Sequence, residues 1–76
     1  MYRTDVDIVT QILEITANRG SNTTKIMDGA FLSQAQLKNY LTILTESDLL
    51  QYDDGLNKVT ITEAGIRFLK IYNQID

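Results

Sequence analysis

Apolar residues recur three and four positions apart in the first third of the chain, which is the spacing of an amphipathic helix. Residues 5–19 carry one such stripe, with aspartates in the first turn and Gly20 directly after the last turn, as is typical of helix ends. A shorter stripe follows over residues 24–30, and Asn22 or Thr23 can cap it. The pattern therefore predicts two helices joined by a short connection.

A third helix is predicted over residues 34–46. Ser33 and Gln36 form the capping-box pattern, in which the hydroxyl accepts a hydrogen bond from the third amide and the glutamine side chain reaches back. The apolar residues behind this box fall on one face of the helix. They are Leu37, Tyr40, Leu41 and Leu44. Because only a tight turn separates this helix from the one before it, the two form a helix–turn–helix unit.

The period of the pattern changes after residue 48. Residues 49–52 and 58–61 are predicted to be two short strands, with a turn at Asp53-Asp54-Gly55. A two-stranded hairpin is not stable alone, so it must pack against the helices. Thr62 then caps a last helix over residues 63–75. The expected fold class is mainly α with a small β-hairpin, in the order of three helices, two strands and one helix.

Composition limits what such a chain can do. Its 76 residues allow one domain, residues 1–76, and 43% of them are hydrophobic, which is ordinary for a globular protein. There is no membrane-spanning run and no secretory signal pattern, so we expect a cytoplasmic protein. The chain contains neither Cys nor His, so we expect no disulfide, no metal site, no cofactor and no enzyme. The net charge of −3 is unusual for a nucleic-acid binder, because phosphate neutralisation supplies much of the affinity.

Four blocks of residues occur in a characteristic order: Thr24 to Ser33, Leu37 to Leu41, Leu49-Leu50, and Ile61 to Gly65. Together they resemble the archaeal winged helix–turn–helix family of transcription regulators and DNA-binding proteins. The resemblance implies a winged helix, double-stranded DNA as a partner, and pairing through the C-terminal helix as in several relatives. One departure matters: Ser47-Asp48 stands where relatives carry a Lys-Gly pair, so the local charge changes from positive to negative.

The winged-helix docking mode brings the N-terminal residues of the 34–46 helix to the edges of the bases. Asn and Gln pair with adenine, Lys donates to guanine or phosphate, and a helix N-terminus binds phosphate through its amides. The candidate DNA-binding residues are Thr24, Lys25, Ser33, Gln34, Ala35, Lys38, Asn39, Thr42 and Lys58. The same polar run is also compatible with an ordinary solvated helix face.

Two functions stay open on the sequence alone. The first is a transcription regulator that reads the major groove with helix 34–46 and touches the DNA backbone with the 52–58 wing. The second is a protein-interaction module on the same scaffold with little DNA affinity, because Asp53, Asp54 and Glu46 would repel phosphates.

The last helix predicts self-association. Residues 63–75 carry more apolar side chains than one core-facing stripe requires. Leu69 and Tyr72 can dock on the first helix, whereas Phe68, Ile71 and Ile75 fall on an adjoining stripe. We therefore expect a homodimer through this helix, since exposed apolar stripes usually mark interfaces. The alternative is that the core absorbs all of these side chains.

Overall fold

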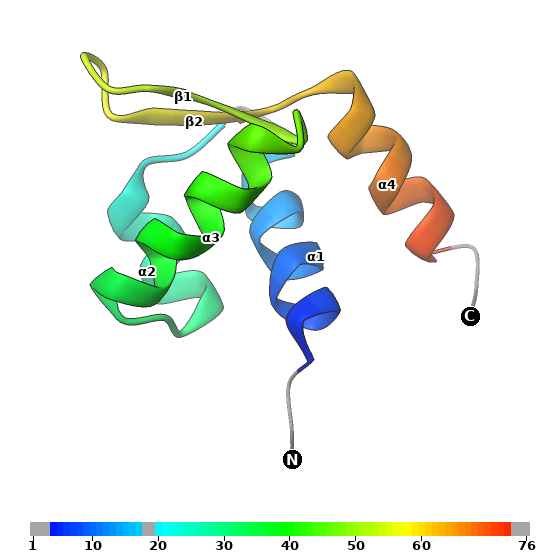
Figure 1. Cartoon of the computed structure of the whole chain (residues 1–76), viewed down its shortest axis with the longest axis horizontal. Coiled ribbons are helices and arrows are strands. Elements are labelled where there is room, and N and C mark those ends of the chain that lie inside the picture. Colours follow the sequence, from blue (N-terminus) through cyan, green and yellow to red (C-terminus); the bar gives the residue numbers. More distant parts are fainter. Residues whose placement is uncertain (1–3, 18–19, 74–76) are drawn as a thin grey trace.

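The structure is a computed structural model that describes residues 4–17 and 20–73 (Figure 1). In chain order its elements are α1 (Asp5–Thr16), α2 (Thr23–Ala30), α3 (Gln34–Glu46), β1 (Leu50–Asp53), β2 (Lys58–Ile61) and α4 (Glu63–Asn73). This order of three helices, an antiparallel hairpin and a helix is the predicted one. The expected fold class, a winged helix–turn–helix, is therefore confirmed.

Side-chain caps begin all four helices, and at α1 the Thr4 hydroxyl accepts a hydrogen bond from the Asp7 amide at 3.1 Å. The Asn22 side-chain oxygen accepts a hydrogen bond from the third amide of α2 at 2.8 Å. Ser33 and Gln36 form the complete capping box at the start of α3. The Thr62 hydroxyl accepts a hydrogen bond from the Gly65 amide at 3.0 Å and so begins α4. The bounds of α3 match the prediction at both ends because its cap and its apolar stripe are both local signals.

The end of α1 differs from the prediction, which extended this helix to residue 19. The helix ends at Thr16, and the Gly20 amide donates to the Thr16 carbonyl at 3.2 Å. Gly20 has a φ of 75° and lies against β2, where a Cβ would be 2.8 Å from the Val59 carbonyl oxygen. The chain leaves the helix early because Ser21, the residue after Gly20, pairs with Val59 of β2. Residues 18–19 lie outside the described residues, as do residues 74–75 of the predicted last helix.

The hairpin is attached to the helices along β2. Asp53 pairs with Lys58 across the two strands, and Leu50 pairs with Ile61. On its other side, β2 meets Ser21, whose amide donates to the Val59 carbonyl at 2.8 Å while the Val59 amide donates back at 2.6 Å. The hairpin is therefore fixed on the helical body at Val59, and the turn beyond this point projects outward (Figure 1).

The hairpin also starts one residue later than predicted. Asp48 has a left-handed backbone (φ 62°), a conformation that Asp tolerates better than most residues. This turn directs the Leu49 amide to the Leu44 carbonyl at 2.9 Å, so Leu49 caps the C-terminal end of α3 from outside the helix and β1 begins at Leu50. The Leu49 carbonyl accepts a hydrogen bond from the Thr62 amide at 3.1 Å. Gly65 of α4 is buried against this carbonyl, which explains a glycine so early in a helix.

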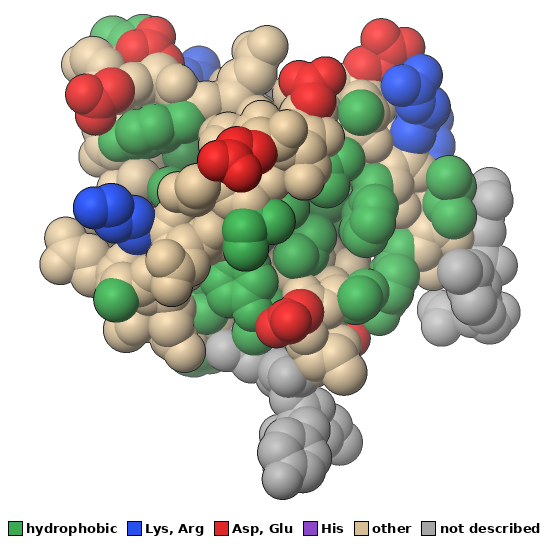
Figure 2. Space-filling view, in the orientation of Figure 1, with side chains coloured by type: hydrophobic (Ala, Val, Ile, Leu, Met, Phe, Trp, Pro, Cys, Tyr) green, Lys and Arg blue, Asp and Glu red, His purple; other side chains and the backbone are tan. Residues whose placement is uncertain are grey.

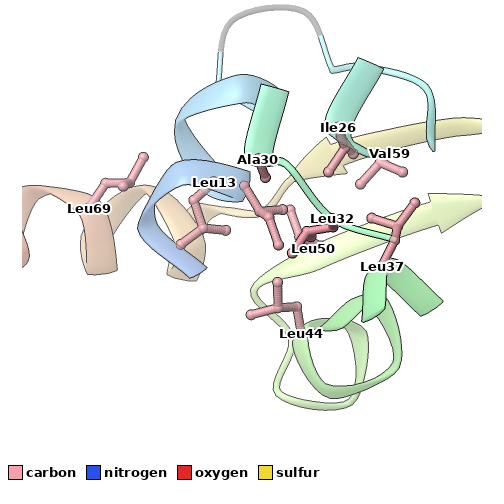
Figure 3. Packing of buried hydrophobic residues seen from close by; sticks show 10 residues of the cluster. Leu13, Ile26, Ala30, Leu32, Leu37, Leu44, Leu50, Val59 and Leu69 are labelled. Carbon is pink, nitrogen blue, oxygen red and sulfur yellow. The ribbon is translucent and has the colours of Figure 1, made fainter. Parts of the chain in front are cut away.

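The hydrophobic core lies where α1, α2, α3 and the hairpin meet (Figure 3). Its buried side chains are Ile12, Leu13, Ile26, Ala30, Leu32, Leu37, Leu44, Leu50, Val59 and Leu69. Figure 3 shows Leu69 of α4 apart from the others, on the far side of α1. In Figure 1, α4 and the tip of the hairpin lie at opposite ends of the molecule.

Candidate nucleic-acid interface

An open groove runs between α3 and the hairpin, and residues at the start of α2 also line it. Leu37, Leu41 and Leu50 contribute apolar surface to this groove. Five of the predicted DNA-binding residues line its walls: Thr24, Gln34, Lys38, Thr42 and Lys58. They come from three elements that are separated in sequence, so the fold assembles one polar surface from them.

The other four predicted residues are exposed but do not line the groove. Lys25 lies beside Thr24 in the first turn of α2. The Ser33 hydroxyl caps α3, and Ala35 lies in the first turn of the same helix. Asn39 is on the opposite flank of α3, where it lines a separate hollow with residues of α1.

Two tyrosine hydroxyls fix the rotation of the outer helices against α1. Tyr40 of α3 donates a hydrogen bond to Asp5 at 2.8 Å, and Tyr72 of α4 donates one to Asp7 at 3.1 Å. Both carboxylates belong to the first turn of α1. With Leu37 and Leu44 buried behind it, α3 keeps one side turned toward the groove and the other toward this hollow.

The charge of the groove is divided between its two walls. Lys38 lies on the α3 wall, whereas Asp53 and Asp54 lie on the hairpin wall. Lys58 is also on the hairpin, at the ladder position across the strands from Asp53, and a carboxylate at such a position lowers the positive potential around a lysine. Asp48 adds a third negative charge at the C-terminal end of α3. Figure 2 shows acidic side chains at the tip of the hairpin and over the end of α3.

The tip of the hairpin is tied to α2 by one side chain that the sequence did not reveal. Asn57 has a left-handed backbone (φ 49°), and its side-chain oxygen accepts a hydrogen bond from the Thr23 hydroxyl at 3.1 Å. The Tyr52 hydroxyl donates to the same oxygen at 3.3 Å and to Asp54 at 3.4 Å. The only signal in the sequence is an Asn just before a strand, since Asn tolerates this backbone conformation.

The pKa of the Tyr52 hydroxyl is raised above its ordinary value by desolvation and then by the negative charge of Asp54. The hydroxyl therefore keeps its proton at neutral pH and remains a hydrogen-bond donor at the tip. Elsewhere, no three acidic, His or Cys side chains of the described residues form a group that could hold a metal ion. None of the described helices has the length and the apolar run that a membrane span requires.

A helix–turn–helix followed by a hairpin on one edge, with a groove between them, defines the winged-helix class of domains. Comparison with family models agrees with the geometry, because residues 2–76 match the winged helix-turn-helix family. The chain therefore belongs to this family, and its membership indicates DNA binding. A comparison with curated proteins gave no match. The archaeal source stays a prediction.

Proposed function

We propose that this protein is a transcription regulator that inserts the N-terminal half of α3 into the DNA major groove. The observation that carries the proposal is the single polar wall formed by Gln34, Lys38 and Thr42 along the open groove. Glutamine pairs in a bidentate manner with adenine, and lysine donates to guanine. Lys38 is exposed and none of these three side chains belongs to the core, so each is able to meet a base edge.

The start of α2 supplies the contacts to the DNA backbone in this proposal. Thr24 and Lys25 occupy the first turn of α2, where the backbone amides and the lysine ammonium group favour a phosphate. Ser33 and Ala35 flank the reading residues at the start of α3. Asn39 is a weaker candidate for contacts to base edges than the groove residues, because it lines the hollow on the opposite flank of α3.

The wing contributes weakly to affinity. Lys58 is the cation of the hairpin that faces the groove, and Asp53 lies opposite it. Lys25, Lys38 and Lys58 give three candidate phosphate contacts per protomer, so a dimer would make about six. The logarithm of the affinity should then fall by about 5 for each unit of the logarithm of the salt concentration.

The proposal includes a homodimer that pairs through α4. Ile71 is 63% exposed on this helix, and the neighbouring Phe68 is half-buried, with its ring stacked 6.5 Å from that of Tyr72. Figure 2 shows hydrophobic side chains gathered between α3 and α4. Ile75, the third residue of the predicted stripe, lies outside the described residues. A two-fold dimer would present two copies of α3 to a palindromic site.

Fluorescence anisotropy with short duplexes, one of them from the region upstream of the protein's own coding sequence, tests the proposal. We expect binding at low salt that weakens steeply at moderate salt, with one duplex preferred over the others. Absence of binding to every duplex at low salt would contradict the proposal. It would favour the protein-interaction module instead, for which the observation is the excess of three aspartates over two lysines on the groove walls.

A further inference from the structure

The wing of this protein is held at two places. Along β2, two backbone hydrogen bonds join Ser21 to Val59, the second residue of the strand after the turn. At its tip, the Asn57 side chain receives the hydroxyl of Thr23, the first residue of α2. Among the described residues, this is the one side-chain hydrogen bond that joins the tip, residues 54–57, to the helices. The Asn57 side chain therefore adds a tether to the helices beyond the backbone pairing at Val59 and the backbone bond from the Asn57 amide to the Asp54 carbonyl within the turn.

The residues held by this contact are acidic. Asp53 ends β1 and its carboxylate accepts a hydrogen bond from the Leu56 amide at 3.2 Å, which stiffens the turn. Asp54 receives the Tyr52 hydroxyl, which also reaches Asn57. Both carboxylates line the groove on the wall opposite Lys38. The Asn57 contact restricts how far this tip swings away from an approaching phosphate backbone.

We propose that Asn57 is a positioning residue that holds Asp53 and Asp54 as a repulsive element, by which the protein discriminates among DNA duplexes. The inference rests on the proposed DNA binding. Specificity is a difference between affinities, and repulsion of the wrong partner raises it as effectively as attraction of the right one. The two fixed carboxylates disfavour any duplex whose backbone approaches the tip. The penalty is smallest for a duplex whose docking or curvature keeps its backbone away from the tip. Discrimination of this kind is a form of shape readout.

The wing-tip variants separate this role from a structural one. Asn57→Gly keeps the left-handed backbone, which glycine adopts readily, and removes the hydrogen-bond acceptor. Thr23→Val removes the donor with little change of shape, whereas the matched control Thr23→Ser keeps it. Asp53→Asn with Asp54→Asn removes the charge and leaves side-chain oxygens that can still accept hydrogen bonds.

Anisotropy with a random-sequence duplex, and with the duplex that the wild type selects from a random pool, gives the functional readout. The double aspartate variant should bind the random duplex about fivefold more tightly, since one exposed charge contact changes an affinity by up to about that factor. Asn57→Gly and Thr23→Val should each strengthen this binding about twofold to threefold and lower the preference for the selected duplex. Combined with the double aspartate variant, they should change neither quantity further, because the repulsion that they release is already gone.

The heteronuclear NOE of the Gly55 amide gives a readout that needs no DNA. It should be as high as in the helices for the wild type and Thr23→Ser, and lower for Asn57→Gly and Thr23→Val. An unchanged NOE in both variants would refute the claim that the hydrogen bond between Thr23 and Asn57 holds the tip. A lower NOE together with weaker binding to both duplexes would refute the discriminating role. So would a lower NOE together with an equal gain in affinity for the random duplex when the variant is combined with the double aspartate variant. Absence of DNA binding by every variant, the double aspartate variant included, would instead refute the proposed function and with it this use of the tether.

Discussion

The two walls of the groove share one core but differ in charge and in how they are held. The helical wall rests on Leu37 and Leu44, and the hairpin wall rests on Leu50 and Val59, all four buried. The helical wall is held along its whole length by this packing, whereas the Asn57 side chain joins the tip of the hairpin to the helices. The helical wall presents an amide, hydroxyls and a lysine, and the hairpin presents two aspartates and one lysine.

This difference shows that the fold and the electrostatics of a winged helix can vary separately. Buried residues determine where the two walls lie, and exposed residues determine which wall attracts DNA. In this protein the wing keeps its place in the fold while Asp53 and Asp54 make it unfavourable to phosphates. The account therefore assigns attraction and base reading to the helical wall, and selection against unsuitable duplexes to the hairpin.

The largest effect is expected from reversing the charge of the helical wall. Lys38→Glu removes one attraction to DNA and adds one repulsion, so affinity at low salt should fall by more than about tenfold. Lys70→Glu makes the same change of charge on α4, away from the groove, and should have a much smaller effect. Anisotropy titrations of both variants give the comparison. Equal losses in the two would mean that only the net charge matters and that neither wall is the binding surface.

A change of similar or somewhat smaller size is expected at the predicted dimer contact. A dimer would present two helical walls to DNA, one from each protomer. Ile71→Asp places a charge in the proposed interface, so the dimer dissociation constant should rise about tenfold or more. Ile66→Asp is the matched control, because Ile66 is 40% exposed on the other flank of α4. Sedimentation equilibrium measures both. A monomeric wild type, or a dimer that Ile71→Asp leaves intact, would refute pairing through α4.

A smaller effect should separate the two flanks of α3 itself. Gln34 faces the groove, so Gln34→Ala should lower discrimination at one base pair by about 1 kcal/mol, or about fivefold, and change the average affinity less. Asn39→Ala, on the flank that faces the hollow, should change discrimination little. Binding to a set of single-base variants of the preferred duplex measures both. The opposite result would move the reading face to the α1 side of the helix.

Local signals predicted the fold almost completely. The capping box at Ser33 and the apolar stripe behind it determined both ends of α3. The end of α1 was predicted too late because the pairing of Ser21 with Val59, a contact between distant parts of the chain, decides where the chain must turn. A local pattern contains no information about such a partner.

The candidate site could be predicted only in part. Five of the nine residues line the groove, and helical periodicity identified three of them, Gln34, Lys38 and Thr42, as the polar side of α3. The periodicity did not show that Asn39 would turn to the other flank, since this depends on how Tyr40 docks on Asp5. The Asn57 tether joins residues 34 positions apart, so no motif could reveal it.

The salt dependence of binding after neutralising one lysine on each wall tests the central claim most directly. Lys38 lies on the helical wall, and Lys58 lies on the hairpin opposite Asp53. For Lys38→Gln, the slope of log affinity against log salt should become shallower by about 0.9 per protomer bound. For Lys58→Gln the change should be less than half as large, because Asp53 already offsets that charge. An equal or larger change for Lys58→Gln would show that the hairpin wall attracts DNA as strongly as the helical wall, and would contradict the account.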